Sequence, residues 1–258
     1  MKSAVSPEPM RIAPPRTLVA SYAEAPVRVR STVRRFSVFI GPACQVDRYP
    51  ARVTHHTAAG PEIPSGRLVL VRHGETEWSR TGQHTGLTDL PLLPEGEADA
   101  SALVGLLEGF DIRHVRCSPL QRARRTAELA GLRVDEVDPD LLEWDYGGYE
   151  GLTTRDLRER LGYPWTVFEH GVVPGDTSGE TIEEVAARAS RVLDRVLPRL
   201  FEGDVALVGH GQALRILTAV YLRQAPRFGA NLTFQAGAVG VLAHHHEDPV
   251  IDGWNLTG

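Results

Sequence analysis

The sequence predicts an α/β protein: a single three-layer domain whose mostly parallel, mixed sheet carries helices on both faces. From Arg67 onward, short apolar runs alternate with longer segments of helical periodicity. The runs "RLVLVR" (67–72) and "DVALVG" (204–209) are nearly continuously apolar, which is typical of strands that are covered on both faces. Ligands of such sheets bind beyond the carboxyl ends of the strands, so functional residues are expected directly after each strand.

The elements can be assigned in order along the chain. Strands are expected at 67–72, 113–117, 132–137, 204–209 and 238–244, with an edge strand near 249–255. Helices are expected at 94–109, 119–130, 153–161, 180–201 and 211–222. Pro94 and Pro119 stand at the starts of the first two helices, and Gly131 follows the second. Proline at a helix start and glycine past its end are standard boundary signals.

Residues 1–66 differ in composition from the rest of the chain. They are rich in Pro, Arg, Ser, Thr and Ala, show little periodicity, and carry nine basic and four acidic residues, so 9 − 4 = +5. We expect a disordered or non-conserved N-terminal extension, followed by a domain at 67–258. An organellar transit peptide and a translation start near Val46 or Val53 are the alternatives, and N-terminal sequencing of the native protein would distinguish them.

The composition of residues 67–258 excludes several function classes. This part has 19 basic and 29 acidic residues, so 19 − 29 = −10, which argues against binding to nucleic acid because that binding requires clustered Lys and Arg. No apolar stretch is long enough to span a membrane. The two cysteines, Cys44 and Cys117, are far apart and predict neither a disulfide nor a metal site. These features predict a cytoplasmic protein whose partner is a small molecule.

Three strand ends carry histidine or arginine. Arg72, His73 and Gly74 follow the first strand, Arg122 lies just after the second, and His210 with its following glycine comes after the fourth. We expect the glycines to let a tetrahedral ligand approach the backbone, and helix N-termini to attract its charge. Two arginines and two histidines at one sheet edge indicate a phosphoryl site, because the arginine fork binds phosphate oxygens bidentately.

Phosphoryl transfer at such a site needs a nucleophile and a proton donor. A neutral histidine can attack phosphorus without a metal ion, and an alkoxide leaving group requires a general acid. The acidic segment "LLEWDYGGYEG" offers Glu143, Asp145 and Glu150. Spacing alone favours Glu143 as the proton donor, but it does not exclude Asp145 or Glu150 from that role. We expect these two residues to hold the glycine turn instead.

The motifs "LVRHGETEW", "SPLQRARRTA", "EWDYGGYEG", "GET" and "GHGQALR" occur in this order over residues 67–258. Together they resemble the histidine phosphatase superfamily, with the phosphoglycerate mutase-like fold. "GQHTGLTDLPL" and "EWDYGGYEGLTT" are similar to actinobacterial-type broad-specificity acid phosphatases and to sedoheptulose-bisphosphatase-like enzymes. The resemblance implies a phosphatase that acts on small phosphorylated metabolites such as sugar phosphates, with no cofactor and no metal ion.

The resemblance also implies roles for individual residues. His73 would be the phosphorylated nucleophile and Glu143 the proton donor, which later deprotonates water. The phosphoryl oxygens would be held by Arg72, Gly74, Arg122 and His210. Substrate would contact Ser79, Thr85 and Gly86, although Ser79 stands where mutases usually carry Asn. A polar pocket is expected, with a rim formed by Trp78, Thr85, Trp144, Tyr146 and either Trp165 or His170.

Other functions remain as alternatives. A cofactor-dependent phosphoglycerate mutase would share the catalytic residues, but only 180 − 143 = 37 positions separate Glu143 from Glu180, too few for the insert that mutases carry. A non-catalytic phosphate-binding protein is the other alternative, and the phytase branch is disfavoured because its motif reads RHGxRxP. His84 is expected to be a solvated loop residue, and His244 to His246 a solvated strand end without metal. The resemblance is also compatible with a homodimer.

Overall fold

The computed structural model describes residues 63–258. The predicted extension, apart from its last four residues, therefore lies outside the described residues, as do the alternative start positions. The proposed domain boundary at residue 67 stays a prediction. Just ahead of the first strand, the Gly66 N–H donates to the carbonyl oxygen of Leu200 at 2.9 Å.

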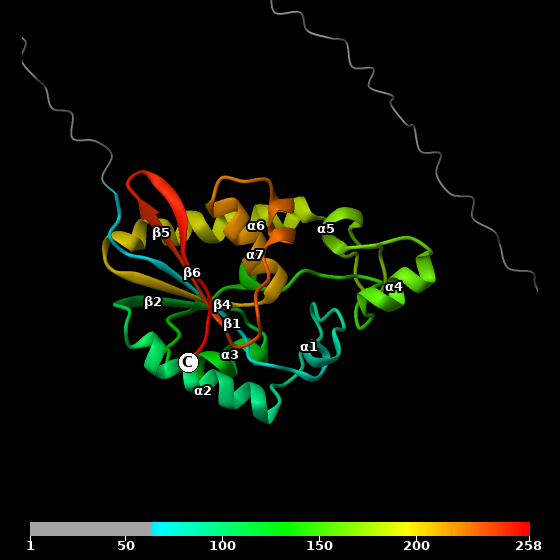
Figure 1. Cartoon of the computed structure of the whole chain (residues 1–258), viewed down its shortest axis with the longest axis horizontal. Coiled ribbons are helices and arrows are strands. Elements are labelled where there is room, and N and C mark those ends of the chain that lie inside the picture. The colour runs from blue at the N-terminus through cyan, green and yellow to red at the C-terminus, as the bar shows by residue number, and fades with distance from the viewer. Residues whose placement is uncertain (1–62) are drawn as a thin grey trace, which may run out of the picture. The chain divides into compact units, whose positions relative to one another are not determined.

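A six-stranded mixed sheet forms the centre of the described structure (Figure 1). The strands are β1 (Leu68–Arg72), β2 (Ile112–Cys117), β3 (Glu136–Val137), β4 (Asp204–Gly209), β5 (Val239–His245) and β6 (Asp248–Leu256). Their order across the sheet is β3-β2-β4-β1-β5-β6. The pairs β3–β2, β2–β4 and β4–β1 are parallel, whereas β5 is antiparallel to β1 and to β6. The predicted mostly parallel, mixed sheet is confirmed.

Alternation along β1 shows why the sheet is covered on both sides. Leu68 and Leu70 belong to one apolar cluster, and Val69 and Val71 belong to the other. All four side chains are fully buried. Because successive side chains of a strand point to opposite faces, a strand with four buried apolar residues needs a helical layer on each side.

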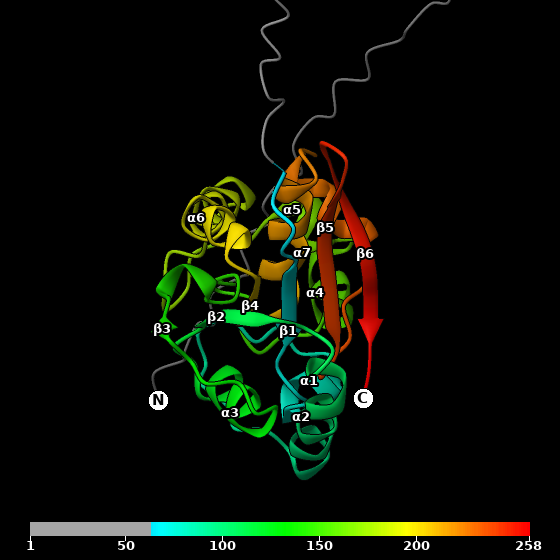
Figure 2. The same cartoon turned by 90° about the vertical axis from the view of Figure 1, so that its left-hand side faces the viewer.

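The helices supply these two layers. They are α1 (Glu77–Thr81), α2 (Pro94–Leu107), α3 (Gln121–Leu129), α4 (Thr154–Leu161), α5 (Val167–His170), α6 (Ile182–Val196) and α7 (Gly211–Tyr221). α2 and α3 cover one face of the sheet, and α6 and α7 cover the other (Figures 1 and 2). The predicted three-layer arrangement is confirmed.

Local sequence signals explain where the longer helices begin. Pro94 is the first residue of α2, and Glu95 and Glu97 follow it in the first turn, where carboxylates interact favourably with the helix dipole. Thr181 caps α6 in a reciprocal capping box with Glu184. Such a cap satisfies two backbone N–H groups that have no partner within the helix.

The structure differs from the expected elements at several short segments. α1 and α5 were not predicted, and neither were the 3₁₀ turns at Pro139–Leu141, Leu197–Phe201 and Pro226–Asn231. α1 has no buried residue, so it leaves no apolar periodicity in the sequence. The strand expected at 132–137 is reduced to Glu136–Val137, and the helix expected at 180–201 changes to 3₁₀ at Leu197, next to a proline.

A third apolar cluster lies around α4 and α5, at the end of the sheet where α1 follows β1 (Figure 1). Its largest fully buried members are Trp144, Tyr146 and Trp165. An isolated bridge joins Gln83 to Thr153 and links the loop after α1 to the start of α4. The segments around α1 and α4 therefore lie beside the strand ends that the sequence singles out.

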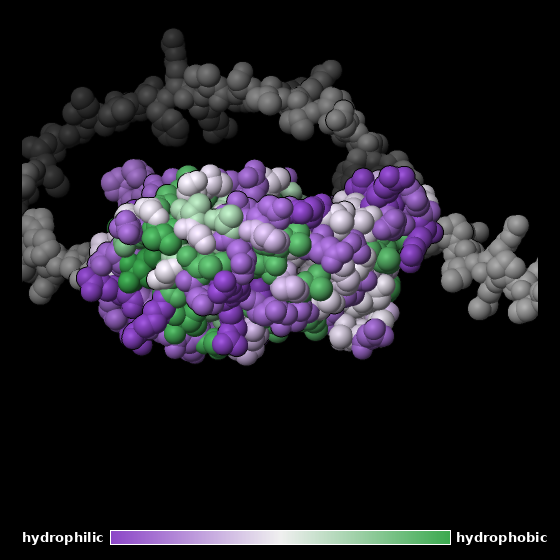
Figure 3. Space-filling model, turned by 90° about the horizontal axis from the view of Figure 1, so that it is seen from below, coloured by the Kyte–Doolittle hydropathy of each residue, from purple (hydrophilic) through white to green (hydrophobic). Residues whose placement is uncertain are grey.

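The surface of the described residues is mixed in polarity. On the face shown in Figure 3, hydrophobic residues are interspersed with hydrophilic ones. No helix among residues 63–258 is both long enough and apolar enough to cross a membrane.

Candidate active site

Adjacent parallel strands bring the two predicted histidines together. Arg72 at the end of β1 is in register with Gly209 at the end of β4. The N–H of His73 donates to the Gly209 carbonyl oxygen at 3.0 Å. As a result, the ring centroids of His73 and His210 lie 5.1 Å apart.

The ring of His73 is held in one orientation. Its Nδ1 lies 2.7 Å from the carbonyl oxygen of Gly74. A carbonyl oxygen only accepts, so Nδ1 carries the proton and Nε2 keeps its lone pair. Burial lowers the pKa of His73 well below its usual 6.5, and the nearby Arg122 and Arg72 lower it further. His73 is therefore a neutral imidazole with one nucleophilic nitrogen.

Arg72 has a buried donor that no protein atom satisfies. Its guanidinium donates to the carbonyl oxygen of Phe234, but its Nε has no partner among the described residues. A Cβ on Gly211 would lie only 3.2 Å from the Arg72 Cζ and Nε atoms, so the glycine makes room for this guanidinium. A half-buried cation with one unsatisfied N–H beside the nucleophile is suited to an incoming anion.

Arg122 and His210 form a fully buried layer behind His73. The Arg122 Nε donates to His210 Nδ1 at 3.1 Å, and His210 Nε2 lies 2.7 Å from the Ser118 hydroxyl oxygen. Since a guanidinium only donates, His210 accepts at Nδ1 and carries its proton on Nε2. Burial, followed by the charge of Arg122, lowers the pKa of His210 well below 6.5.

The remaining donors of Arg122 hold the loop that follows α1. Nη1 donates to the Thr88 carbonyl oxygen at 2.8 Å, and Nη2 donates to the Gly86 carbonyl oxygen at 2.9 Å. Neither Arg122 nor His210 lines the cavity in this structure. Their predicted contact with phosphoryl oxygens stays a prediction, and what the geometry shows is a buried positive layer.

Glu143 occupies the N-terminus of α7. Its Oε1 accepts from the N–H groups of Ala213 at 2.8 Å and Trp144 at 2.9 Å, and its Oε2 accepts from the Gln212 N–H at 3.0 Å. The sequence indicated that this helix end would attract the ligand anion. Instead, the N–H groups of Gln212 and Ala213 at this helix end donate to the carboxylate of the candidate acid, Glu143.

The other two candidate acids, Asp145 and Glu150, accept hydrogen bonds from backbone N–H groups. Asp145 accepts from the Gly147 N–H at 2.9 Å and from the Thr177 hydroxyl at 2.6 Å. Glu150 accepts from the Gly86 N–H at 2.8 Å and therefore holds the loop after α1. Only Glu143 of the three lines the cavity, so the geometry favours it as the proton donor.

A cavity of about 260 Å³ lies over His73 and Glu143. Its lining consists of Arg72, His73, Ser79, Gly82, Gln83, His84, Thr85, Glu143, Tyr146, Thr154, Gly211, Gln212, Arg215 and Phe234. Larger hollows occur elsewhere, including one of about 610 Å³ beside α3, but none of those described contains His73 or Glu143. We assign the candidate site by its chemistry rather than by its size.

Of the predicted substrate residues, two lie at the cavity. Ser79 and Thr85 line it, although the Ser79 hydroxyl also accepts from the Thr76 N–H at 2.8 Å in the capping box of α1, whose N-cap is Thr76. Gly86 does not line the cavity, and a Cβ there would lie 2.5 Å from the Trp144 carbonyl oxygen. The close packing around position 86 therefore explains why this residue is a glycine.

Gly74 is likewise explained by packing. A Cβ on this residue would lie 2.2 Å from the carbonyl oxygen of Gly96 in α2. Its N–H already donates to the Thr126 hydroxyl oxygen at 3.0 Å. The space beside the Gly74 Cα is thus filled by α2, and the predicted contact of Gly74 with phosphate stays a prediction.

The predicted rim also needs correction. Tyr146 lines the cavity, whereas Trp78 and His170 do not. Trp144 and Trp165 are buried in the apolar cluster around α4 and α5. Tryptophan type alone gave no information about which side chains face the cavity.

His84 is not the solvated loop residue that we expected. Its ring lies 4.6 Å from that of Tyr146 and 5.4 Å from that of Trp165, measured between centroids. Its Nε2 lies 3.3 Å from the Thr154 hydroxyl oxygen. Burial lowers its pKa to about 4. His84 is therefore a neutral, packed part of the cavity wall.

Sequence reasoning missed Arg215 and its neighbour Gln212. Arg215 donates to the carbonyl oxygens of Gly229 at 2.9 Å and Ala230 at 3.2 Å, and also to the side-chain oxygen of Gln212. Its guanidinium carbon lies 4.7 Å from the centroid of the Phe168 ring. Arg215 is the last residue of the motif "GHGQALR". It stands four residues, about one helical turn, after Gly211, and this spacing was the available signal.

Three arginines near the cavity lack a carboxylate partner. Among residues 63–258, Arg72, Arg122 and Arg215 form no ion pair, whereas most other arginines do. Glu143 is the one carboxylate that lines the cavity. Arg122 is fully buried, and Arg72 and Arg215 are half-buried. A surplus of positive charge beside a neutral histidine suits a phosphoryl dianion.

Within the described part of the chain, no group of three or more His, Cys, Asp or Glu side chains is placed to hold a metal ion. His244, at the end of β5, lies with its ring centroid 5.6 Å from that of Tyr221. The positive charges that surround the cavity come from arginine.

Comparison with known proteins agrees with this geometry. The chain is 37% identical over 199 residues to an acid phosphatase of Mycobacterium tuberculosis, covering 76% of this chain and 95% of that protein. It is 37% identical over 186 residues to the sedoheptulose 1,7-bisphosphatase of Saccharomyces cerevisiae, covering 60% and 67%. A solved structure of an open-reading-frame product from M. tuberculosis superposes with a TM-score of 0.71 at 36% identity, covering 75% of this chain and 98% of that one.

The family comparison covers nearly all of the described residues. Residues 68–257 match the model of the histidine phosphatase superfamily, branch 1. This range contains all five motifs and every strand and helix of the described structure. The chain belongs to the histidine phosphatase superfamily (branch 1).

Proposed function

We propose that this chain hydrolyses small phosphomonoesters through a phosphohistidine formed on His73. The observation that carries the proposal is the state of the His73 ring, which is neutral, with Nδ1 bound to Gly74 and Nε2 left as the nucleophilic nitrogen at the cavity. Arg72, which lines the same cavity and carries an Nε without an acceptor among the described residues, is the adjacent cation for a phosphoryl oxygen.

The reaction then proceeds in two steps. In the first, His73 Nε2 attacks phosphorus, the ester P–O bond breaks, and Glu143 gives its proton to the leaving oxygen. In the second, the Glu143 carboxylate accepts a proton from water, whose oxygen attacks phosphorus while the P–N bond breaks. Inorganic phosphate leaves, and neutral His73 and protonated Glu143 are restored. Acid–base help of this kind contributes about 10²- to 10⁴-fold to a rate.

The cavity supports a small, polar substrate. Its volume of about 260 Å³ is slightly smaller than the smallest pockets that hold drug-sized ligands, roughly 300 Å³. Gln83, Thr154, Gln212 and Arg215 offer hydrogen-bonding groups beyond the phosphoryl end. Sugar phosphates and similar metabolites have hydroxyl groups to match, and one of the two relatives is named for a sugar bisphosphate.

A phosphoglycerate mutase is the second candidate, and the segment after Glu143 weighs against it. Arg155 is paired with Glu159 at 2.9 Å, and Arg158 donates to the Trp165 carbonyl oxygen at 2.9 Å. Neither these residues nor Arg160 lines the cavity. The short segment supplies no additional cation for a substrate carboxylate, so water is expected to reach the phosphohistidine.

A screen of phosphorylated metabolites tests the proposal directly. We expect phosphate release from several sugar phosphates and from p-nitrophenyl phosphate, with activity retained in a metal chelator because arginines supply the charge. Faster conversion of 3-phosphoglycerate to its 2-isomer than phosphate release would instead identify a mutase. Full hydrolysis by a His73→Ala variant would overturn the mechanism, and phosphate binding without turnover would indicate a binding protein.

Three further expectations belong with this proposal. The domain at 67–258 is proposed to carry the activity without residues 1–66. The homodimer and the cytoplasmic location also stay proposals, which light scattering and cell fractionation would test.

A further inference from the structure

Glu143 lies on a backbone segment with little regular structure. After the 3₁₀ turn at Pro139–Leu141, no helix or strand is formed through Tyr146. Buried carbonyl groups in such a segment need donors from elsewhere. The position of the Glu143 carboxylate therefore depends on whatever holds this segment in place.

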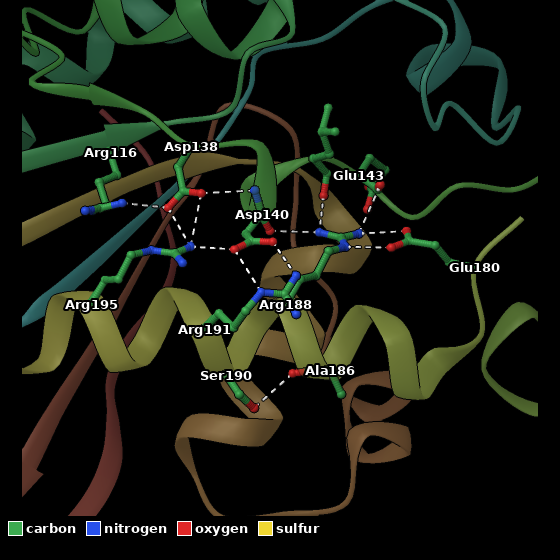
Figure 4. Close-up of polar contacts among 11 residues, drawn as sticks. Arg116, Asp138, Asp140, Glu143, Glu180, Ala186, Arg188, Ser190, Arg191 and Arg195 are labelled. Carbon is green, nitrogen blue, oxygen red and sulfur yellow. Dashed lines mark hydrogen bonds and ion pairs between the residues drawn. The ribbon is translucent and has the colours of Figure 1, made fainter.

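Arg188 supplies those donors from α6 (Figure 4). Its Nη1 donates to the carbonyl oxygens of Asp140 at 3.0 Å and Leu142 at 2.5 Å, and its Nη2 donates to the Glu143 carbonyl oxygen at 3.1 Å. The side chain is buried, with 7% of the residue surface exposed. One guanidinium thus holds the backbone on both sides of the Glu143 Cα.

Glu180 in turn fixes Arg188. The Arg188 Nε donates to Glu180 Oε1 at 2.9 Å and its Nη2 to Oε2 at 3.1 Å. All five N–H groups of the guanidinium are then accounted for, which a lysine ammonium cannot reproduce. Glu180 Oε2 also accepts from the Asp145 N–H at 3.0 Å, and the Glu180 carbonyl accepts from the Trp144 indole at 2.8 Å.

We propose that the Arg188–Glu180 pair is a positioning device that sets the place of Glu143 over the cavity and so tunes proton donation to the leaving group. The inference rests on the proposed function, in which Glu143 is the general acid. Glu143 is held from both ends: its carboxylate at α7 by Gln212 and Ala213, and its backbone by Arg188 on α6. A displaced backbone moves the carboxylate away from the leaving oxygen.

Leaving-group dependence separates positioning from general stability. p-Nitrophenolate leaves without much protonation, whereas the alkoxide of β-glycerol phosphate needs a proton. The ratio of kcat/KM for β-glycerol phosphate to kcat/KM for p-nitrophenyl phosphate therefore reports proton donation in the first step. A variant that is only less stable lowers both values by the same factor and leaves the ratio unchanged.

The experiment compares Arg188→Lys with Arg191→Met and Glu143→Gln in the full chain. Arg191 lies on the same helix but pairs with the side chain of Asp140 and touches none of the three carbonyls. We expect the ratio to fall about 10-fold or more in Arg188→Lys, about 100-fold or more in Glu143→Gln, and less than about 2-fold in Arg191→Met.

Each outcome decides between defined alternatives. An unchanged ratio in Arg188→Lys, together with a fallen ratio in Glu143→Gln, overturns the positioning role and leaves the proposed mechanism intact. An unchanged ratio in Glu143→Gln overturns the general acid and, with it, this inference. If Arg188→Lys does not fold, Glu180→Gln takes its place, because it keeps the volume and weakens the same pair. A fallen ratio in that variant supports the role, and an unchanged ratio overturns it.

Discussion

The Nδ1 atom of His73 lies 2.7 Å from the carbonyl oxygen of Gly74, and this contact fixes which ring nitrogen can react. The phosphoenzyme is therefore expected to carry phosphate on Nε2 of His73. Rapid quenching at alkaline pH followed by mass spectrometry would locate it. His73→Ala should lose p-nitrophenyl phosphate hydrolysis by at least about 1,000-fold. His84→Gln is the control and should still form the phosphoenzyme. Phosphate on another residue would contradict the assignment.

Stability should fall at acidic pH because of buried histidines. The pKa of His84 is lowered to about 4, so between pH 6.5 and 4 the unfolded chain binds a proton there that the folded chain does not. The contribution of His84 is fully present above pH 6.5 and is lost by about 1.4 kcal/mol per pH unit as the pH falls through that window. His73 and His210, whose pKa values are also lowered, act in the same direction.

Urea unfolding at pH 7 and pH 5.5 would measure this effect. The free energy of unfolding of the unmodified chain should decrease by about 1 kcal/mol more than that of His84→Gln between the two pH values. Equal decreases in the two proteins would show that His84 is protonated in the folded state.

Two glycines near His73 should respond differently to alanine. In Gly74→Ala the new Cβ meets backbone of α2 at 2.2 Å, so the unfolding free energy should drop by about 2–3 kcal/mol. In Gly211→Ala the Cβ meets the Arg72 guanidinium at 3.2 Å, so stability should hold while kcat/KM falls about 10-fold through displacement of that cation. Calorimetry and p-nitrophenyl phosphate kinetics separate the two effects; the reverse pattern would contradict both assignments.

Arg215 should determine how well polar leaving groups bind. Arg215→Met removes a cationic donor from the cavity wall, and a hydrogen bond to a charged group is worth about 1.5–3 kcal/mol. We therefore expect KM for sugar phosphates to rise by about 10-fold or more, with little change for p-nitrophenyl phosphate. The exposed Arg199→Met serves as control. Equal losses for both substrates would place Arg215 at the phosphoryl end instead.

The sequence predicts the sheet and its four longest helices because their apolar periodicity records burial. It likewise predicts His73 and Glu143, which stand at fixed places in recognisable motifs, and the structure places both at the cavity. α1 was missed because it buries no residue, and no apolar pattern results. A helix that is held mainly by its cap at Thr76 is difficult to detect from periodicity.

The differences from the predicted site have a common cause. Gly74 and His84 were interpreted from residue type, yet their roles depend on which distant segment packs against them: Gly96 in one case and Tyr146 in the other. The role of Arg188 could not be predicted from the sequence, because its partners are backbone carbonyls of a segment 45 to 48 positions away. Contacts between a side chain and remote backbone leave no mark in a single sequence.

The three arginines without carboxylate partners make stability and turnover depend on the same anion. Burying unneutralised cations is costly when the cavity is empty, and the product phosphate relieves that cost when it binds. Inorganic phosphate should therefore raise the melting temperature in proportion to the logarithm of its concentration and should also compete with substrate. In a cell rich in free phosphate, this protein would therefore be more resistant to unfolding but would turn over its substrate more slowly.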